Sequence, residues 1–183
     1  MEIKETTLNS EIIYNGKIIK VIKDTVILPD GNQAFREVVE HPGGVSVLPI
    51  DSNGDILLVE QFRYPYKEAT LEIPAGKRNS KDEDPLECGK RELSEETGAE
   101  ADKFTFLGEL YPTPGYCGEI IYIFAATGLT FGEIHTDEDE FLNVKRMPLE
   151  KAIELVIKGE IKDSKTQVAI LKAKILLDRG ELL

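Results

Sequence analysis

The sequence predicts an α+β fold in which mixed β-sheets pack between α-helices. Two observations support this prediction. Strand-like runs rich in β-branched and aromatic residues fill the first third of the chain, and one helical pattern interrupts the strands before two more close the chain. The 183 residues, 41% of them apolar, are enough for one globular unit with a sizeable core.

The predicted strands are bounded by turn residues. Two β-rich runs within residues 11–28 flank Asn15-Gly16, a dipeptide that favours a tight hairpin because both turn positions must accept positive φ. Turns at Asp30-Gly31 and at residues 52–55 separate the next runs, which we interpret as a meander of strands. The further strands are expected at residues 34–41, 44–51, 55–64, 103–111, 119–131 and 141–147.

The first predicted helix lies in the middle of the chain. Asp84 is its N-cap, Pro85 its first residue and Glu87 its third, and Gly98 ends it. One stripe of this helix is apolar or small and is assigned to the core. The stripe consists of Leu86, Gly89 and Leu93.

Two further helices are predicted near the C-terminus. One runs from Pro148 to Gly159, with proline at its start and glycine at its end. The other begins at Ser164, which we expect to form a capping pair with Gln167. Its core-facing stripe is expected to contain Val168, Leu171, Ile175 and Leu176.

A boundary is expected near Pro42-Gly43-Gly44. Residues 1–42 would form a small N-terminal β lobe, and residues 43–183 the main domain. We see no internal repeat, low-complexity segment or long linker in the sequence.

Composition and charge exclude several classes of partner. The 34 Asp and Glu outnumber the 22 Lys and Arg, which gives a formal charge of −12 and disfavours binding to nucleic acid. The sequence has no signal-peptide pattern and no apolar run of membrane-spanning length, so we expect a soluble, cytoplasmic protein. Cys88 and Cys117 are expected to be ordinary thiols.

Three carboxylates stand close together on the first helix. Glu92, Glu95 and Glu96 are neighbours on one arc, since helix residues three and four apart lie side by side. Their mutual repulsion costs a few tenths of a kcal/mol per pair. Taken alone, such a cluster is more often solvated surface than a functional site.

The surrounding spacing changes this interpretation. Gly76 is followed by a loop, Glu83, seven residues and then "RELSEETGA" from Arg91 to Ala99. This pattern resembles the Nudix box, the strand-loop-helix signature of enzymes that hydrolyse a nucleoside diphosphate linked to another group. The loop between Gly76 and Glu83 holds six residues, one more than the family pattern has. The difference concerns the geometry of the loop and leaves the helix carboxylates in place.

The resemblance implies a divalent-cation site and the Nudix fold. Glu92, Glu95, Glu96 and the backbone carbonyl of Ala75 would hold Mg²⁺, with Mn²⁺ or another divalent cation as the alternative. Such ions neutralise charge on the phosphate oxygens and make hydroxide available near neutral pH. Arg91 would orient the carboxylates, and Glu83 would be structural or an outer metal contact.

Other segments resemble the bacterial type of ADP-ribose pyrophosphatase, a group within this family. The resemblance runs from about residue 37 to the last helix. It implies that Arg63 and Glu119 contact the substrate, Glu119 at the terminal ribose, and that Arg36 is a further phosphate or ribose contact. It also implies a homodimer whose N-terminal lobe reaches the partner's adenine pocket. Tyr14 and Phe35 are both candidates to stack on the base.

The acidic stretch from Glu133 to Glu140 has two interpretations. Composition alone indicates a solvated loop. In the resembling pyrophosphatases, a loop here carries a glutamate that deprotonates the attacking water. On that basis Glu138 is the expected base, and Glu140 a metal or water contact.

The implied activity is hydrolysis of ADP-ribose to AMP and ribose 5-phosphate. The alternatives are another nucleoside diphosphate derivative, such as a nucleotide sugar, a dinucleoside polyphosphate or NADH, a non-catalytic ADP-ribose sensor, or a structural acidic module. Individual residues also have simpler interpretations. Arg63 could extend its charge to solvent at a strand end, and His41 and His135 are expected at the surface. Cys117 is expected to pack in its loop, and Tyr111, Tyr116 and Tyr122 to be core or rim aromatics.

Overall fold

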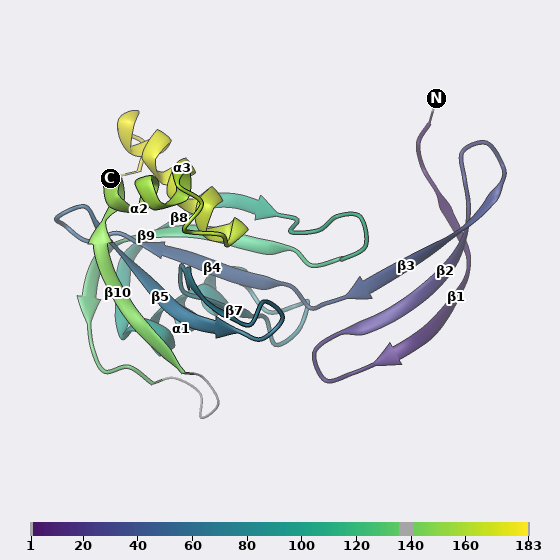
Figure 1. Cartoon of the computed structure of the whole chain (residues 1–183), viewed down its shortest axis with the longest axis horizontal. Helices are drawn as coiled ribbons and strands as arrows, with labels where there is room; N and C mark the ends of the chain where they lie inside the picture. The colour runs from purple at the N-terminus through teal and green to yellow at the C-terminus, as the bar shows by residue number, and fades with distance from the viewer. Residues whose placement is uncertain (1, 136–140, 183) are drawn as a thin grey trace.

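The structure is a computed structural model that describes residues 2–135 and 141–182. Over these residues the chain forms ten strands and three helices, with the strands arranged in three sheets (Figure 1). The α+β class predicted from the sequence is confirmed. None of the helices in these two ranges is long and apolar enough to span a membrane.

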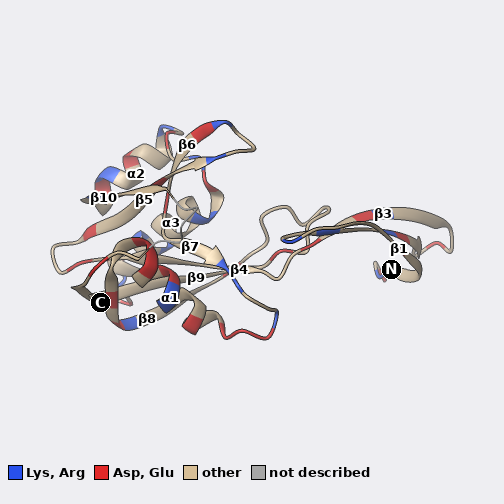
Figure 2. Cartoon of the chain, turned by 90° about the horizontal axis from the view of Figure 1, so that it is seen from below, with Lys and Arg blue, Asp and Glu red and all other residues tan. Residues whose placement is uncertain are grey.

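The N-terminal strands form a sheet of their own. Its members, in the order in which they pair, are β1 (Thr6–Asn15), β2 (Lys20–Ile27) and β3 (Gln33–Glu40), all antiparallel. This sheet projects away from the rest of the molecule as a long arm (Figures 1 and 2). At its inner end, the Val39 N–H donates to the Tyr116 carbonyl (2.8 Å) and the Gly118 N–H donates to the Val39 carbonyl (2.9 Å). The arm is therefore attached to the loop that precedes Glu119.

Two more sheets and three helices make up the main body. The strands are β4 (Gly44–Pro49), β5 (Asp55–Arg63), β6 (Glu68–Glu72), β7 (Ala75–Lys77), β8 (Ala99–Leu110), β9 (Ile121–Phe131) and β10 (Leu142–Pro148). The helices are α1 (Pro85–Thr97), α2 (Leu149–Ile157) and α3 (Ser164–Asp178). One sheet has the order β7-β4-β9-β8, and the other β10-β5-β6. Helix α1 covers one face of the four-stranded sheet, and α3 packs from the opposite side (Figure 1).

Strand β4 is buried on both faces and separates two hydrophobic clusters. Val45 and Val47 pack with Leu93 of α1. Leu48 faces the other way and packs in the cluster that contains Ile170 of α3. A strand covered on both faces has a continuous apolar sequence, which residues 45–50 show with the exception of Ser46 and Pro49.

Helix α1 begins and ends where the sequence predicts. The Asp84 carboxylate accepts hydrogen bonds from the N–H groups of Leu86 (2.8 Å) and Glu87 (3.2 Å), and Gly98 closes the helix at φ 66°. Gly89 lets the helix approach β4 closely, since a methyl group at this position would lie 3.0 Å from Val45 Cγ1. These contacts fix the height and rotation of the helix that carries the glutamates.

The hairpin between β1 and β2 is confirmed, but its turn is not the tight turn expected from Asn15-Gly16. Residues 16–19 form the connection, with the Gly16 N–H donating to the Ile19 carbonyl (3.0 Å). Neither Asn15 nor Gly16 has positive φ. A Cβ at Gly16 would lie 2.6 Å from the exposed Tyr14 ring, so the ring would have to move to accommodate any other residue here.

The predicted meander of β3, β4 and β5 is wrong, because these three strands lie in three different sheets. After β4, the chain turns at Asp51 and enters the second sheet, where β5 pairs with β6 and β10. Strand β4 instead pairs in parallel with β9 and antiparallel with β7.

The predicted start and stripe of α3 also need correction. The N-cap is Asp163, whose carboxylate accepts the Thr166 N–H (2.9 Å), while Gln167 donates to the Ile161 carbonyl (2.9 Å). The buried positions of α3 include Thr166, Ala169, Ile170 and Ala173. Leu171 and Ile175 are exposed, and Val168 and Leu176 are partly buried against the core.

Candidate active site

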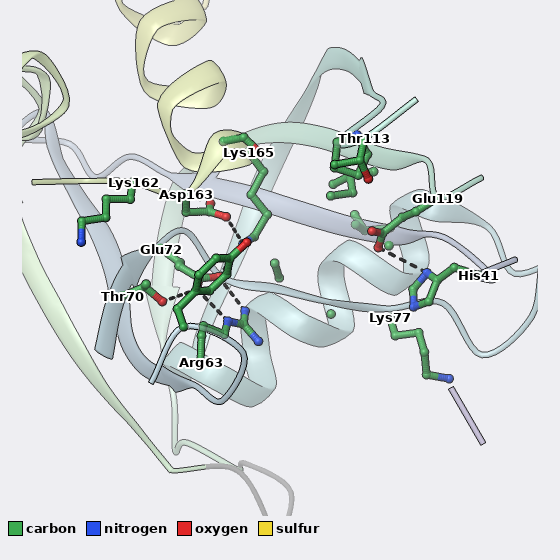
Figure 3. A pocket seen from close by; sticks show the side chains of 18 of the residues that line it. His41, Arg63, Thr70, Glu72, Lys77, Thr113, Glu119, Lys162, Asp163 and Lys165 are labelled. Carbon is green, nitrogen blue, oxygen red and sulfur yellow. Dashed lines mark hydrogen bonds and ion pairs between the residues drawn. The ribbon is translucent and has the colours of Figure 1, made fainter. Parts of the chain in front are cut away.

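A cavity of about 600 Å³ opens where the two sheets of the main body and the start of α3 meet (Figure 3). One wall carries Arg63 of β5 and Glu72 of β6, together with Lys165 of α3. The other wall carries Glu119 and His41. Residues 75–77 of β7 lie between the walls and connect the cavity to the glutamates of α1.

The glutamates of α1 are packed against β7. Glu92 and Glu96 are buried, with exposed fractions of 7% and 2%, whereas Glu95 is partly exposed. The Ala75 N–H donates to Glu96 Oε2 (3.1 Å). A Cβ on Gly76 would lie 1.9 Å from Glu92 Cδ, so only glycine leaves room for this carboxylate. The interpretation of these side chains as solvated surface is therefore wrong for Glu92 and Glu96.

Arg91 lies among the acids of the helix. Its Nη1 is 2.7 Å from Glu92 Oε1 and 2.8 Å from Glu95 Oε2, and its Nη2 is 3.8 Å from Glu83 Oε1. Burial lowers the pKa of Arg91, but the neighbouring carboxylates, Glu92 first, outweigh burial and raise it. The guanidinium thus stays charged and holds Glu92 and Glu95 at a fixed spacing.

The donor atoms on this face suit a hard divalent cation. Glu92, Glu95 and Glu96 offer carboxylate oxygens, and the Ala75 carbonyl belongs to the adjacent strand. Oxygen ligands of this kind are those that Mg²⁺ prefers. Within the described residues, no three acidic, histidine or cysteine side chains already converge on one metal-sized point.

Glu72 is the most heavily bonded acid on the cavity wall. It is 2% exposed, and it accepts hydrogen bonds from Arg63 Nε (2.7 Å), Arg63 Nη2 (2.6 Å) and Thr70 Oγ1 (2.6 Å). Lys165 Nζ forms an ion pair with the same carboxylate. Burial raises the pKa of Glu72, but the hydrogen bonds from Arg63 and the charge of Lys165 outweigh it and bring the pKa to about 2.

Glu119 and His41 form the opposite wall. His41 Nδ1 lies 3.2 Å from Glu119 Oε1 and accepts the Gly43 N–H (3.1 Å). Burial lowers the pKa of His41 more than the Glu119 charge raises it, which favours the neutral ring. The prediction of a surface histidine is wrong for His41, whose side chain is 14% exposed. His135 is exposed, as predicted.

The structure places three predicted substrate contacts, Arg36, Tyr14 and Phe35, on the N-terminal arm and outside the lining of the cavity of their own chain. Arg36 lies on β3 in the N-terminal arm, where it pairs with Glu5. Tyr14 and Phe35 are exposed on the same arm. Glu138 and Glu140 lie outside the described residues.

The remaining loop and rim residues mostly follow the prediction. Tyr111 and Tyr116 are exposed, and Tyr122 is half-buried. Cys117 is half-buried, and its backbone forms an isolated parallel β-bridge with Val39. Cys88 is buried on α1, and burial raises the pKa of its thiol to about 11, which makes it unreactive as a nucleophile.

The strand-loop-helix unit expected of a Nudix hydrolase is present, and its α1 carboxylates pack against the β7 residues that line the cavity. The sequence matches the model of the NUDIX domain over residues 40–167 and that of the nucleoside diphosphate sugar hydrolase N-terminal domain over residues 5–39. The chain therefore belongs to the Nudix family of hydrolases.

Similar proteins cover almost the whole chain. An ADP-ribose pyrophosphatase of Bacillus subtilis (strain 168) is 42% identical over 170 residues, which is 92% of this chain and 91% of that protein. A methanol dehydrogenase activator of Bacillus methanolicus is 40% identical over 91% of both chains. A GDP-mannose pyrophosphatase of Yersinia enterocolitica is 35% identical over 96% of this chain and 97% of that protein.

The fold is also found in a solved structure. The crystal structure of an ADP compounds hydrolase superposes with a TM-score of 0.83 and covers 97% of both chains at 23% identity. This similarity confirms the Nudix fold, including the N-terminal arm.

Proposed function

We propose that the protein hydrolyses the diphosphate bridge of ADP-ribose to give AMP and ribose 5-phosphate. The observation that carries this proposal is a cavity of about 600 Å³ with the Arg63 guanidinium on one wall and the Glu119 carboxylate on the other. The α1 glutamates lie next to the β7 residues that line it. A diphosphate needs cations, and a ribose hydroxyl needs an acceptor such as a carboxylate. The pyrophosphatase from Bacillus subtilis supports the same substrate.

A divalent cation fits the α1 face of this site. Glu92, Glu95, Glu96 and the Ala75 carbonyl would hold Mg²⁺, or Mn²⁺ in its place. Bound there, the ion would supply charge neutralisation at the phosphate oxygens and activation of water. Arg91 would hold the glutamates in position, since it already bridges two of them.

The other residues have separate proposed roles. Arg63 would bind the substrate, and Glu119 would accept hydrogen bonds from the terminal ribose. Glu138 would remove the proton from the attacking water, with Glu140 as a further metal or water contact. The order of these two glutamates follows from family resemblance alone.

The N-terminal lobe, residues 1–42, would complete the site in a homodimer. Its arm carries Arg36, Tyr14 and Phe35 away from the cavity of its own chain, which suits contacts with a partner's substrate. Residues 43–183 would form the hydrolase domain. The arm exposes several large apolar side chains, namely Leu8, Ile12, Ile13, Tyr14, Ile18 and Phe35.

A nucleotide sugar is the second candidate substrate. The GDP-mannose pyrophosphatase from Yersinia enterocolitica is similar over the full length of the chain and motivates this alternative. A sensor that binds ADP-ribose without cleaving it is disfavoured, because all three glutamates of α1 are present and two of them are packed against β7.

The test is a substrate panel on the purified protein with Mg²⁺ and with EDTA, read by product chromatography. ADP-ribose, GDP-mannose, ADP-glucose, diadenosine polyphosphates and NADH are compared. We expect ADP-ribose to be cleaved fastest, only with the metal, and Glu96→Gln to lose about 100-fold or more in kcat while remaining folded. Faster cleavage of another compound would overturn the substrate. Binding of ADP-ribose without cleavage would favour the sensor.

A further inference from the structure

Glu72 and Arg63 are joined in a fixed arrangement on the cavity wall (Figure 3). Arg63 donates two hydrogen bonds to the Glu72 carboxylate, from Nε to Oε1 (2.7 Å) and from Nη2 to Oε2 (2.6 Å). Neither of these two hydrogen bonds uses Nη1, and no residue in the described part of the chain forms a hydrogen bond with it. Because the guanidinium is planar, fixing one edge fixes the direction of the other.

The rest of the cluster holds the Glu72 carboxylate itself. Thr70 Oγ1 donates to Oε1 (2.6 Å), and Lys165 Nζ pairs with Oε2. Lys165 in turn lies 2.9 Å from Oδ1 of Asp163, the N-cap of α3. The cluster therefore contains two cations and two anions, and it ties strands β5 and β6 to the start of α3.

The cluster is also close enough to α1 for the charge of a glutamate on that helix to act on Arg63. The hydrogen bonding of Arg63 to the Glu72 carboxylate is the main cause that raises the pKa of Arg63, and the Glu96 charge contributes to the shift. A buried ion pair is weak support for stability, because taking charges out of water offsets most of their attraction. A charged cluster at a cavity is better explained by what it presents to a ligand.

We propose that Glu72 is a positioning residue that holds the Arg63 guanidinium with its Nη1 edge toward the substrate. This inference rests on the proposed function, in which Arg63 binds the substrate. Lys165 supports this arrangement, because its positive charge balances the second carboxylate of the cluster. An arginine held in place before binding loses less conformational freedom when the substrate arrives.

The test is a double-mutant cycle with Arg63→Gln, Glu72→Gln and the double variant, measured as kcat/KM for ADP-ribose. We expect each single variant to lose about tenfold to hundredfold, mainly through a higher KM, because hydrogen bonds to a charged group are involved. The double variant should be no worse than Arg63→Gln alone. Losses that multiply would overturn the proposal, because Glu72 would then act independently of Arg63.

A matched control separates positioning from general stability. Asp51 is also a buried acid paired with an arginine, Arg146, but it lies outside the cavity. Asp51→Asn should lower the melting temperature and leave kcat/KM unchanged well below that temperature. If Asp51→Asn raises KM as much as Glu72→Gln does, the Glu72 effect is structural and the proposal fails.

Three further experiments keep the test decisive if the first measurements cannot be made or give an unexpected substrate. If Glu72→Gln does not fold, Glu72→Gln combined with Lys165→Met removes both charges and should fold, with the same loss in kcat/KM. If the wild-type protein prefers another compound of the panel, the proposed substrate fails, and the cycle on that compound decides the role of Glu72 separately. If no compound is cleaved, the same cycle is measured as the Kd of ADP-ribose by calorimetry.

Discussion

Gly76 is the residue at which β7 and α1 come closest at the site. Its φ is not in the positive range, so alanine would fit the backbone, but the added methyl would collide with the Glu92 carboxylate at 1.9 Å from Cδ. The flexible end of Glu92 would move, and the fold would be retained. We expect Gly76→Ala to lower kcat by about 100-fold, since misplacing a catalytic group by about 1 Å costs this much. Steady-state kinetics and thermal unfolding measure the two effects.

Gly132→Ala is the control for this prediction. A Cβ at Gly132 would meet its nearest neighbour, the Gly98 carbonyl oxygen, at 3.8 Å, which is an ordinary contact. This variant should keep both activity and melting temperature. Wild-type activity in Gly76→Ala would show that hydrolysis does not depend on where the Glu92 carboxylate lies.

The residues that sequence could assign are those whose signal is local. Glu92, Glu95, Glu96 and Arg91 lie within one and a half turns of a helix, so their spacing alone places them together. The structure adds two pairs with no such signal. Lys165 reaches Glu72 across 93 positions of sequence, and His41 meets Glu119 from another part of the chain. Tertiary packing brings these residues together, and no periodicity or motif in the sequence predicts their contact.

The elements show the same division between local and distant causes. Helix α1 was predicted at both ends because Asp84 and Gly98 determine the caps within the helix itself. The pairing of β4 was not predicted, because its partner β9 follows α1 and β8 in the chain and the choice depends on which faces the helices cover. Turn residues between β4 and β5 indicated a reversal of direction but not a change of sheet.

At the start of α3, two adjacent residues are both good N-caps by type. The structure selects Asp163 over Ser164, since its carboxylate accepts the Thr166 N–H at 2.9 Å and the Thr166 hydroxyl at 2.5 Å. We expect Asp163→Ala to lower the free energy of unfolding by about 1 kcal/mol or more. Asp163→Asn should cost less because asparagine also caps. Urea unfolding gives both values.

Ser164→Ala is the matched control for the cap. We expect a change of no more than about 0.5 kcal/mol, the range of an ordinary surface substitution. A larger loss in Ser164→Ala than in Asp163→Ala would mean that the serine caps the helix in solution.

At the scale of the whole molecule, the arm formed by β1, β2 and β3 is the feature whose exposed surface the contacts within one chain explain least. Every residue of β1 is exposed, and β1 is an edge strand with unpaired backbone groups on its outer side. The sequence indicated strands in this region, because the alternation of side chains is local. The sequence also indicated a boundary near residues 42–44, but it could not indicate that the lobe would project as a long arm, because that depends on contacts the rest of the chain does not provide.

The arm should be covered by a second copy of the chain in solution. Ile12 is 60% exposed on β1, and an aspartate there would have to be desolvated inside an interface. We expect the wild-type protein to have twice the mass of one chain by light scattering. Ile12→Asp should be monomeric, and its kcat/KM should be lower because the partner's arm would no longer complete the site. Ile157→Asp, at an exposed position on α2 in the main body, should remain dimeric and active. A monomeric wild-type protein that is fully active would assign the whole site to one chain and leave the arm with another role.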